Sequence, residues 1–274
     1  MEFGEQFRVK TGEGFDFQQV DPDETLGLDR DEADSRRRSW RDKIISRQYD
    51  LAAEGRRALL IVLQGMDCSG KDSTTRRVFS GVNPSGIRVT SFKEPTHEEL
   101  AHDFLWRVHK RTPSRGKIAI FNRSQYEDVL IVRVEKLVEE EVWRSRYDRI
   151  NEFERNLVDE GTTILKFCLV ISKEEQRDRL ISRLRSERKN WKFNSADVRK
   201  HQRWDEYVEA YEDAISETST DHAPWYVIPA GRKWLRDYVV TRIVADTLDA
   251  MDPKPPPLRV DPEQMIRILR SEAE

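Results

Sequence analysis

Residues 58–72 read ALLIVLQGMDCSGKD, an apolar run that passes directly into a glycine-rich turn. A continuous apolar run of this kind is typical of a strand that is buried on both faces of a parallel sheet. The turn from Gly65 to Lys71 matches the spacing G-x-x-x-x-G-K, in which backbone amides and a lysine surround a chain of phosphates. We predict a helix over about residues 70–79, so the order of strand, loop and helix that this motif requires is present.

A phosphate chain needs closely approaching N–H donors, the positive end of a helix, and a mobile cation. Glycines permit the close approach, and the ammonium group of Lys71 can reach the phosphate that is transferred. We therefore expect phosphate or nucleotide contacts along the loop and the first helical turn, from Gly65, Met66, Cys68, Ser69, Gly70, Asp72 and Ser73.

The loop departs from the common pattern at two acidic positions. Asp72 stands where a serine or threonine usually binds Mg²⁺, with Ser73 after it. Asp67 lies inside the loop, where its charge would repel phosphate unless Mg²⁺ lies between them. We interpret Asp67 as a metal ligand or as a group that positions the acceptor; the alternative is that it caps amides of its own loop.

A second cluster follows the strand predicted over residues 117–121. Asn122 can coordinate weakly or orient a water, and Arg123 can pair with phosphate oxygens. Glu127 has two open interpretations. It completes a capping box with Ser124, or it holds metal and positions the acceptor phosphate.

The rest of the chain alternates between strands and helices. Further strands are predicted over residues 87–92, 163–171 and 225–229, and helices over 36–54, 96–108, 125–138, 140–159, 195–216 and 231–250. This order predicts an α/β three-layer sandwich, with about five parallel strands flanked by helices. The G-x-x-x-x-G-K loop after the first strand makes the predicted fold P-loop kinase-like.

Charge divides the chain into regions. Residues 13–34 carry nine acidic residues and one basic, so we expect residues 1–35 to form an extended acidic arm. Residues 36–250 form the predicted phosphotransferase domain, and residues 251–274 a proline-rich tail with a short helix.

Residues 173–203 carry eleven basic and five acidic residues. They form either a solvated helical face or a basic helical lid that closes on phosphates and excludes water. In a lid, Lys192 would contact phosphate.

Composition excludes several classes of protein. The chain has 274 residues, with 48 Lys and Arg against 51 Asp and Glu, and two cysteines. It has no apolar run long enough to span a bilayer, no signal-peptide pattern and no cysteine framework. With a pI near 6.1 it also has no nucleic-acid recognition motif. We expect a cytoplasmic protein with neither membrane nor nucleic acid as a partner.

The chain resembles the polyphosphate kinase 2 family over roughly residues 40–250. The resemblance rests on these segments together: LQGMDCSGKD (63–72), FKEPT (92–96), HDFLWR (102–107), FNRSQYEDVL (121–130), WKF (191–193), WD (204–205) and APWYVIPA (223–230). It implies a thymidylate kinase-like fold and reversible phosphate transfer between inorganic polyphosphate and nucleoside mono- and diphosphates. It also implies Mg²⁺ as cofactor, with Mn²⁺ as a substitute, and a homo-oligomer, either dimer or tetramer.

The resemblance assigns roles to particular residues. It implies catalytic roles for Asp67, Lys71, Arg123 and two lid arginines, Arg179 and Arg183. Lys93 would line the polyphosphate groove. Many members have Asp at the position of Asn122, which weakens a two-carboxylate metal site here. The segment from Asn122 to Glu127 is similar to the subgroup that accepts both mono- and diphosphates, and we expect Glu127 to account for that breadth.

Three functional hypotheses follow. The first is a polyphosphate-dependent nucleotide phosphotransferase. The second is an ATP-dependent nucleoside monophosphate kinase of the thymidylate kinase type, which the loop alone would equally support. The third is a binding protein that has lost its chemistry, for which Asn122 gives some support. The choice of phosphate donor separates the first two hypotheses, and binding without turnover would indicate the third.

Overall fold

Five parallel strands form a single sheet in the order β2-β3-β1-β4-β5 in the computed structural model, which describes residues 2–271. Their bounds are β1 (Ala58–Gln64), β2 (Ile87–Ser91), β3 (Ile118–Asn122), β4 (Thr162–Val170) and β5 (Trp225–Pro229). All five predicted strands are confirmed, each to within one residue at either end. Every residue of the central strand β1 is buried, as its apolar run predicts.

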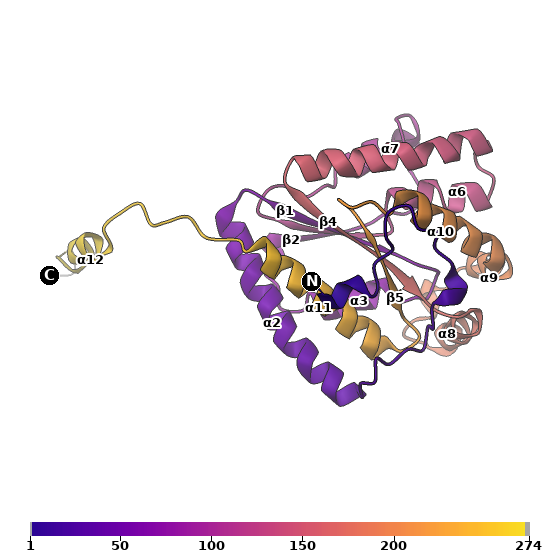
Figure 1. Cartoon of the computed structure of the whole chain (residues 1–274), viewed down its shortest axis with the longest axis horizontal. Helices are drawn as coiled ribbons and strands as arrows, with labels where there is room; N and C mark the ends of the chain where they lie inside the picture. The colour runs from indigo at the N-terminus through magenta and orange to yellow at the C-terminus, as the bar shows by residue number, and fades with distance from the viewer. Residues whose placement is uncertain (1, 272–274) are drawn as a thin grey trace.

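Helices cover both faces of this sheet and complete the predicted three-layer architecture (Figure 1). One layer contains α2 (Arg30–Glu54), α3 (Lys71–Val78) and α11 (Lys233–Met251). The other contains α6 (Ile131–Val134), α7 (Glu140–Asp159) and α10 (Trp204–Thr218). The predicted lid consists of α8 (Lys173–Arg185), η4 (Asn190–Lys192) and α9 (Ser195–Gln202). The remaining short elements are α1 (Glu2–Glu5), η1 (Phe17–Gln19), η2 (Pro84–Gly86), α4 (His97–Leu100), α5 (Trp106–His109), η3 (Gln125–Asp128) and α12 (Pro262–Ser271).

Strand register places the candidate site at one edge of the sheet. Leu63 of β1 lies opposite Asn122 of β3 on one side and Phe167 of β4 on the other. The glycine-rich loop after β1 and the residues after β3 therefore leave the sheet side by side. This edge holds the carboxyl ends of the parallel strands, where open α/β sheets bind ligands.

Three predicted helices are interrupted. The segment 96–108 forms α4 and α5, because the Asp103 carboxylate accepts the Leu105 amide at 3.0 Å and closes a turn between them. The segment 125–138 forms η3 and α6, and 195–216 forms α9 and α10 with a break at Arg203. At the first of these breaks, a side chain that binds a nearby backbone amide competes with continuous helix, which a periodic apolar pattern does not reveal.

The N-terminal segment differs from the extended acidic arm expected for residues 1–35. Phe7 is buried in the main core, and its carbonyl accepts the amide of Val227 at 2.7 Å. Helix α2 begins at Arg30, with Asp29 capping its first turn, so the expected boundary at residue 36 falls inside a helix. The high proportion of acidic residues gave no indication of this packing, because a few aromatic side chains are enough to attach a charged segment to the core.

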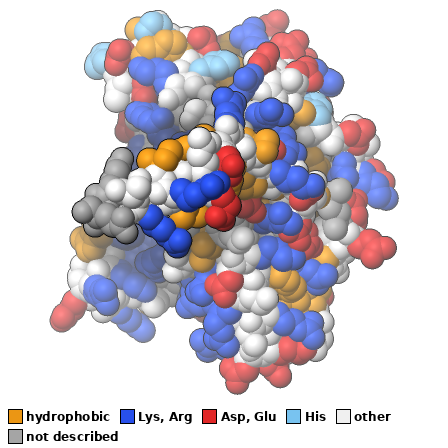
Figure 2. Space-filling model, turned by 90° about the vertical axis from the view of Figure 1, so that its left-hand side faces the viewer, with side chains coloured by type: hydrophobic (Ala, Val, Ile, Leu, Met, Phe, Trp, Pro, Cys, Tyr) orange, Lys and Arg blue, Asp and Glu red, His pale blue; other side chains and the backbone are white. Residues whose placement is uncertain are grey.

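The proline-rich tail leaves the domain after α11 and contains α12, none of whose side chains is buried (Figure 1). Figure 2 views the molecule from the side of this tail and shows basic and acidic side chains interspersed over that face. No helix in residues 2–271 is long and apolar enough to cross a membrane.

Candidate active site

The glycine-rich loop is held tightly between β1 and β4. Gly65 has φ +136°, and a Cβ there would lie 2.5 Å from the Leu169 carbonyl oxygen, so only glycine fits. The Gly65 amide donates to the hydroxyl of Tyr211 at 3.2 Å. The loop thus begins at a fixed point that is set by both the sheet and α10.

Lys71 folds back over this loop. Its Nζ donates to the Gly65 carbonyl at 2.5 Å and to the Met66 carbonyl at 3.2 Å. Burial, aided by repulsion from Arg123, lowers the pKa of the Lys71 ammonium. The ammonium therefore lies against the loop carbonyls, near the N-terminus of α3, where a bound anion is favoured.

Asp67 is the centre of a charge network at the mouth of the loop. Its Oδ1 accepts from Arg123 Nη2 at 2.6 Å, and its Oδ2 lies 3.5 Å from Lys200 Nζ. Burial opposes ionisation of Asp67, but attraction to Arg123, Lys71 and Lys200 outweighs burial and lowers its pKa to about 2. Asp67 is therefore a carboxylate at any working pH.

A narrow pocket opens beside this network. Its lining residues come from the loop after β1, the residue after β3, and η3, α6, α8, α9 and α10: Gly65, Met66, Asp67, Arg123, Glu127, Ile131, Gln176, Lys200, Tyr207 and Tyr211. Glu127 and Asp67 both raise the pKa of Arg123, against the lowering effect of burial. The two carboxylates and the guanidinium thus act on one another within a single site.

The helix-capping interpretation of Glu127 finds little support in the contacts of residues 2–271. The Ser124 hydroxyl accepts the Tyr126 amide at 3.3 Å, and the reciprocal bond of a capping box is not formed. Glu127 instead faces the pocket shared with Asp67 and Arg123.

Asn122, Asp72 and Lys192 form a second polar chain at the same edge. The Asn122 amide donates to Asp72 Oδ1, and Lys192 Nζ lies 3.6 Å from Asp72 Oδ2. Asp72 therefore joins β3 to the lid through the first turn of α3.

Two predicted phosphate contacts, Ser73 and Lys93, lie outside the pocket lining. The Ser73 hydroxyl donates to the Gly70 carbonyl at 2.8 Å and accepts from Arg236 at 3.0 Å, so it faces α11. The Lys93 side chain is exposed after β2, outside the pocket lining.

The two lid arginines make contacts within the protein. Arg179 donates to the carbonyls of Cys68 at 3.0 Å and of Ala230 and Gly231 at 2.8 Å each. Arg183 pairs with Asp197 at 3.2 Å, which links α8 to α9. Neither guanidinium lines the pocket described above.

Five pocket residues were not predicted by the sequence analysis: Ile131, Gln176, Lys200, Tyr207 and Tyr211. Lys200 entered only as one member of a basic run. The two tyrosines have a helical spacing of four, which is typical of a core face, and both are buried as well as lining the pocket. Gln176 donates to the Asp67 carbonyl at 3.0 Å, a contact that no local pattern signals.

The residues present fit a divalent cation that substrate helps to hold. No cluster of three or more His, Cys, Asp or Glu side chains within residues 2–271 could hold a metal alone. Mg²⁺, however, is commonly held by one or two carboxylates together with substrate phosphates. Asp67, which is ionised, and Glu127 are the two carboxylates of the pocket.

The parallel sheet, the phosphate-binding loop and the charged pocket at the strand ends define a phosphotransferase of the P-loop class. A family profile described as Polyphosphate kinase 2 matches residues 27–256. The chain belongs to the Polyphosphate kinase 2 family, which confirms the resemblance seen in the sequence.

Individual relatives agree with this assignment. The AMP/ADP-polyphosphate phosphotransferase of Meiothermus ruber is 50% identical over 251 residues, which cover 90% of this chain and 93% of the relative. The ADP-polyphosphate phosphotransferase of Rhodopseudomonas palustris is 41% identical, with 90% of both chains covered. The crystal structure of Polyphosphate Kinase 2 from Arthrobacter aurescens TC1 superposes with a TM-score of 0.94 at 38% identity, covering 98% of this chain and 96% of that one.

Proposed function

We propose that this protein transfers the terminal phosphate of inorganic polyphosphate to nucleotides, converting ADP to ATP, GDP to GTP and AMP to ADP, reversibly. The observation that carries the proposal is one pocket in which Asp67 of the phosphate-binding loop lies together with Arg123 and Glu127. Family membership favours this activity over an ATP-dependent nucleoside monophosphate kinase, and relatives of high coverage are named for polyphosphate.

The chemistry needs no protein nucleophile. A terminal phosphate oxygen of the acceptor attacks the terminal phosphorus of polyphosphate. The bond from that phosphorus to its bridging oxygen breaks, and the shortened chain leaves with the electron pair. Catalysis then consists mainly of positioning and charge stabilisation.

The chain's own groups supply both. The amides after Gly65 and the N-terminus of α3 receive the donor phosphates, and Lys71 bonds their oxygens in place of its loop carbonyls. Arg123 exchanges its bond to Asp67 for phosphate oxygens. Asp67 and Glu127 would hold Mg²⁺ together with substrate oxygens, and the cation would neutralise charge between donor and acceptor.

The lid completes the site. Lys200 of α9 and Lys192 of η4 reach Asp67 and Asp72 respectively, so the lid is already in contact with the loop. Closure over substrate excludes water, which would otherwise compete with the acceptor for the phosphoryl group. The protein would act in the cytoplasm as a homo-oligomer, in keeping with the family resemblance.

The decisive experiment measures ATP formation from ADP with long-chain polyphosphate and Mg²⁺, and then ADP and ATP formation from AMP. We expect activity with both acceptors. Activity with ADP alone would retain the reaction and overturn the broad acceptor range. Inactivity with both, combined with transfer from ATP to a nucleoside monophosphate, would overturn the proposal.

A further inference from the structure

A buried arginine supports the phosphate-binding loop from behind. Arg236, in the first turn of α11, is 1% exposed and lies beside the fully buried Asp237. Its Nε and Nη2 donate to Asp237 Oδ1 at 2.9 and 2.6 Å. Burying two charges costs free energy, and further hydrogen bonds to the guanidinium offset part of that cost. The partners of those hydrogen bonds therefore indicate what Arg236 does.

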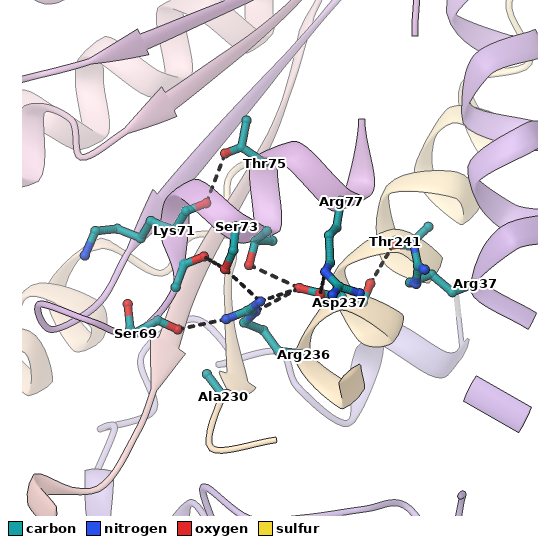
Figure 3. Close-up of polar contacts among 12 residues, drawn as sticks. Arg37, Ser69, Lys71, Ser73, Thr75, Arg77, Ala230, Arg236, Asp237 and Thr241 are labelled. Carbon is teal, nitrogen blue, oxygen red and sulfur yellow. Dashed lines mark hydrogen bonds and ion pairs between the residues drawn. The ribbon is translucent and has the colours of Figure 1, made fainter. Parts of the chain in front are cut away.

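Those remaining contacts go to the loop and to α3. Arg236 Nη1 donates to the Ser69 carbonyl at 3.1 Å, and Nη2 donates to the Ser73 hydroxyl at 3.0 Å (Figure 3). Gly70 has φ +108°, which favours glycine, and a Cβ there would overlap Arg236 Nη1, so a side chain at this position would displace the guanidinium. Arg236 thus packs directly against the loop and the first turn of α3.

A second guanidinium approaches the same peptide from the lid. Arg179 Nη1 lies 3.0 Å from the Cys68 carbonyl and 3.4 Å from the Ser69 carbonyl. Its Nη2 holds the carbonyls of Ala230 and Gly231, at the turn that leads into α11. The Ser69 carbonyl therefore accepts one hydrogen bond from a guanidinium of α8 and one from a guanidinium of α11.

The orientation of that carbonyl decides the orientation of the next amide. The carbonyl and the N–H of a trans peptide point in opposite directions. Because the Ser69 carbonyl points toward Arg236, the Gly70 N–H points away from Arg236. Figure 3 shows the Lys71 side chain leaving α3 on the side away from Arg236.

We propose that Arg236 is a positioning residue that, with Arg179, fixes the Ser69–Gly70 peptide so that the Gly70 N–H and the Lys71 ammonium face the polyphosphate together. This inference rests on the proposed function for its substrate. It assigns Arg179 a positioning role as well, in place of the catalytic role that the family resemblance implies. Asp237 orients Arg236 and keeps its fork in register with the loop.

The test compares Arg236→Lys with Arg77→Ala. Lysine keeps the positive charge but cannot bond Ser69, Ser73 and Asp237 at the same time, as the planar guanidinium does. Arg77 belongs to the same cluster, with its Nε 3.4 Å from Asp237 Oδ2, but it does not bond the loop. We expect Arg236→Lys to lower kcat/KM for polyphosphate by about 10- to 100-fold, with KM for ADP changed less than about twofold. Arg77→Ala should retain kcat/KM within about twofold while lowering the melting temperature.

Two further measurements do not depend on turnover. Hydrogen exchange of the loop amides in residues 66–75 should accelerate in Arg236→Lys but not in Arg77→Ala, and affinity for inorganic tripolyphosphate should fall in parallel. If Arg236→Lys does not fold, Asp237→Asn replaces it, with the same expected direction.

Unchanged kcat/KM and unchanged loop exchange in Arg236→Lys would overturn the inference, as would equal losses in Arg77→Ala. A wild-type protein without polyphosphate activity would overturn the proposed function. In that case loop exchange and tripolyphosphate affinity still decide the role of Arg236.

Discussion

Arg123 donates a hydrogen bond of 2.6 Å to Asp67 across the mouth of the phosphate-binding loop, and it does so from a left-handed backbone conformation with φ +63°. A non-glycine residue in this region is strained, by roughly 1 kcal/mol or more. Its amide still bonds the Leu63 carbonyl at 3.1 Å, so β1 and β3 maintain the strain. Arg123, which we assign to phosphate binding, and Asp67, which we assign to Mg²⁺ binding, are therefore hydrogen-bond partners of each other.

The Asp67 carboxylate should make stability depend on pH in an acidic window. Its folded-state pKa of about 2 lies below the unfolded value, so its stabilisation is present above pH about 4 and is lost as pH falls toward 2. Urea unfolding should show wild type losing about 2 kcal/mol over that range relative to Asp67→Asn. Parallel pH profiles for the two proteins would contradict this assignment. Asp67→Asn should also lose Mg²⁺-dependent transfer.

Lys71→Ala tests the loop assignment directly. The buried ammonium contacts only loop carbonyls among the hydrogen-bond partners in the described chain, so its loss should leave the fold intact. We expect kcat to fall about 100- to 1,000-fold, as when one preorganised donor to a developing charge is removed. Lys117→Ala is the matched control, because Lys117 bonds the Ser85 carbonyl at the far end of β3. Near-normal turnover in Lys71→Ala would show that the loop is not the phosphate site.

The sheet and the loop could be predicted because their signals are local. An apolar run such as residues 58–63 is typical of a strand in the middle of a parallel sheet that is covered on both faces. The G-x-x-x-x-G-K spacing directly encodes a loop that admits phosphate. Both features depend on neighbouring residues alone.

The rest of the site depends on how distant helices pack. Lys200 reaches Asp67 across 133 residues of sequence, and Tyr211 bonds the Gly65 amide across 146. Arg236 contacts the loop across 167 residues. No periodicity or motif predicts contacts between residues so far apart in the sequence. The acidic composition of the N-terminal segment likewise did not predict that Phe7 packs on β5.

Glu127→Gln tests acceptor breadth. We expect kcat/KM with AMP to fall about tenfold or more relative to kcat/KM with ADP, because the shorter acceptor depends more on positioning within the pocket. Initial rates with saturating polyphosphate give both values. Glu141→Gln, an exposed change on α7, should leave the ratio unchanged. An equal loss with both acceptors would assign Glu127 to the transfer step instead of to selectivity.

A buried ionic network lies beneath η3, the element that carries Glu127. Lys166 and Glu154 are both fully buried, and Lys166 Nζ lies 2.6 Å from Glu154 Oε2. Glu154 also accepts from the hydroxyl of Tyr126 at 2.8 Å and from Gln125 Nε2 at 3.0 Å. The network therefore ties the first two residues of η3 to β4 and α7.

Lys166→Met should destabilise the protein by about 3–5 kcal/mol, because it leaves the Glu154 carboxylate buried without a cation. The double variant with Glu154→Leu should cost less than the sum of the two single changes, since it removes the stranded charge. Urea unfolding of the four proteins measures this coupling directly. Lys173→Met is the surface control: Lys173 pairs with the exposed Asp205 at 3.8 Å, and its loss should cost at most about 1 kcal/mol. Additive costs in the cycle would show that the buried pair is not coupled.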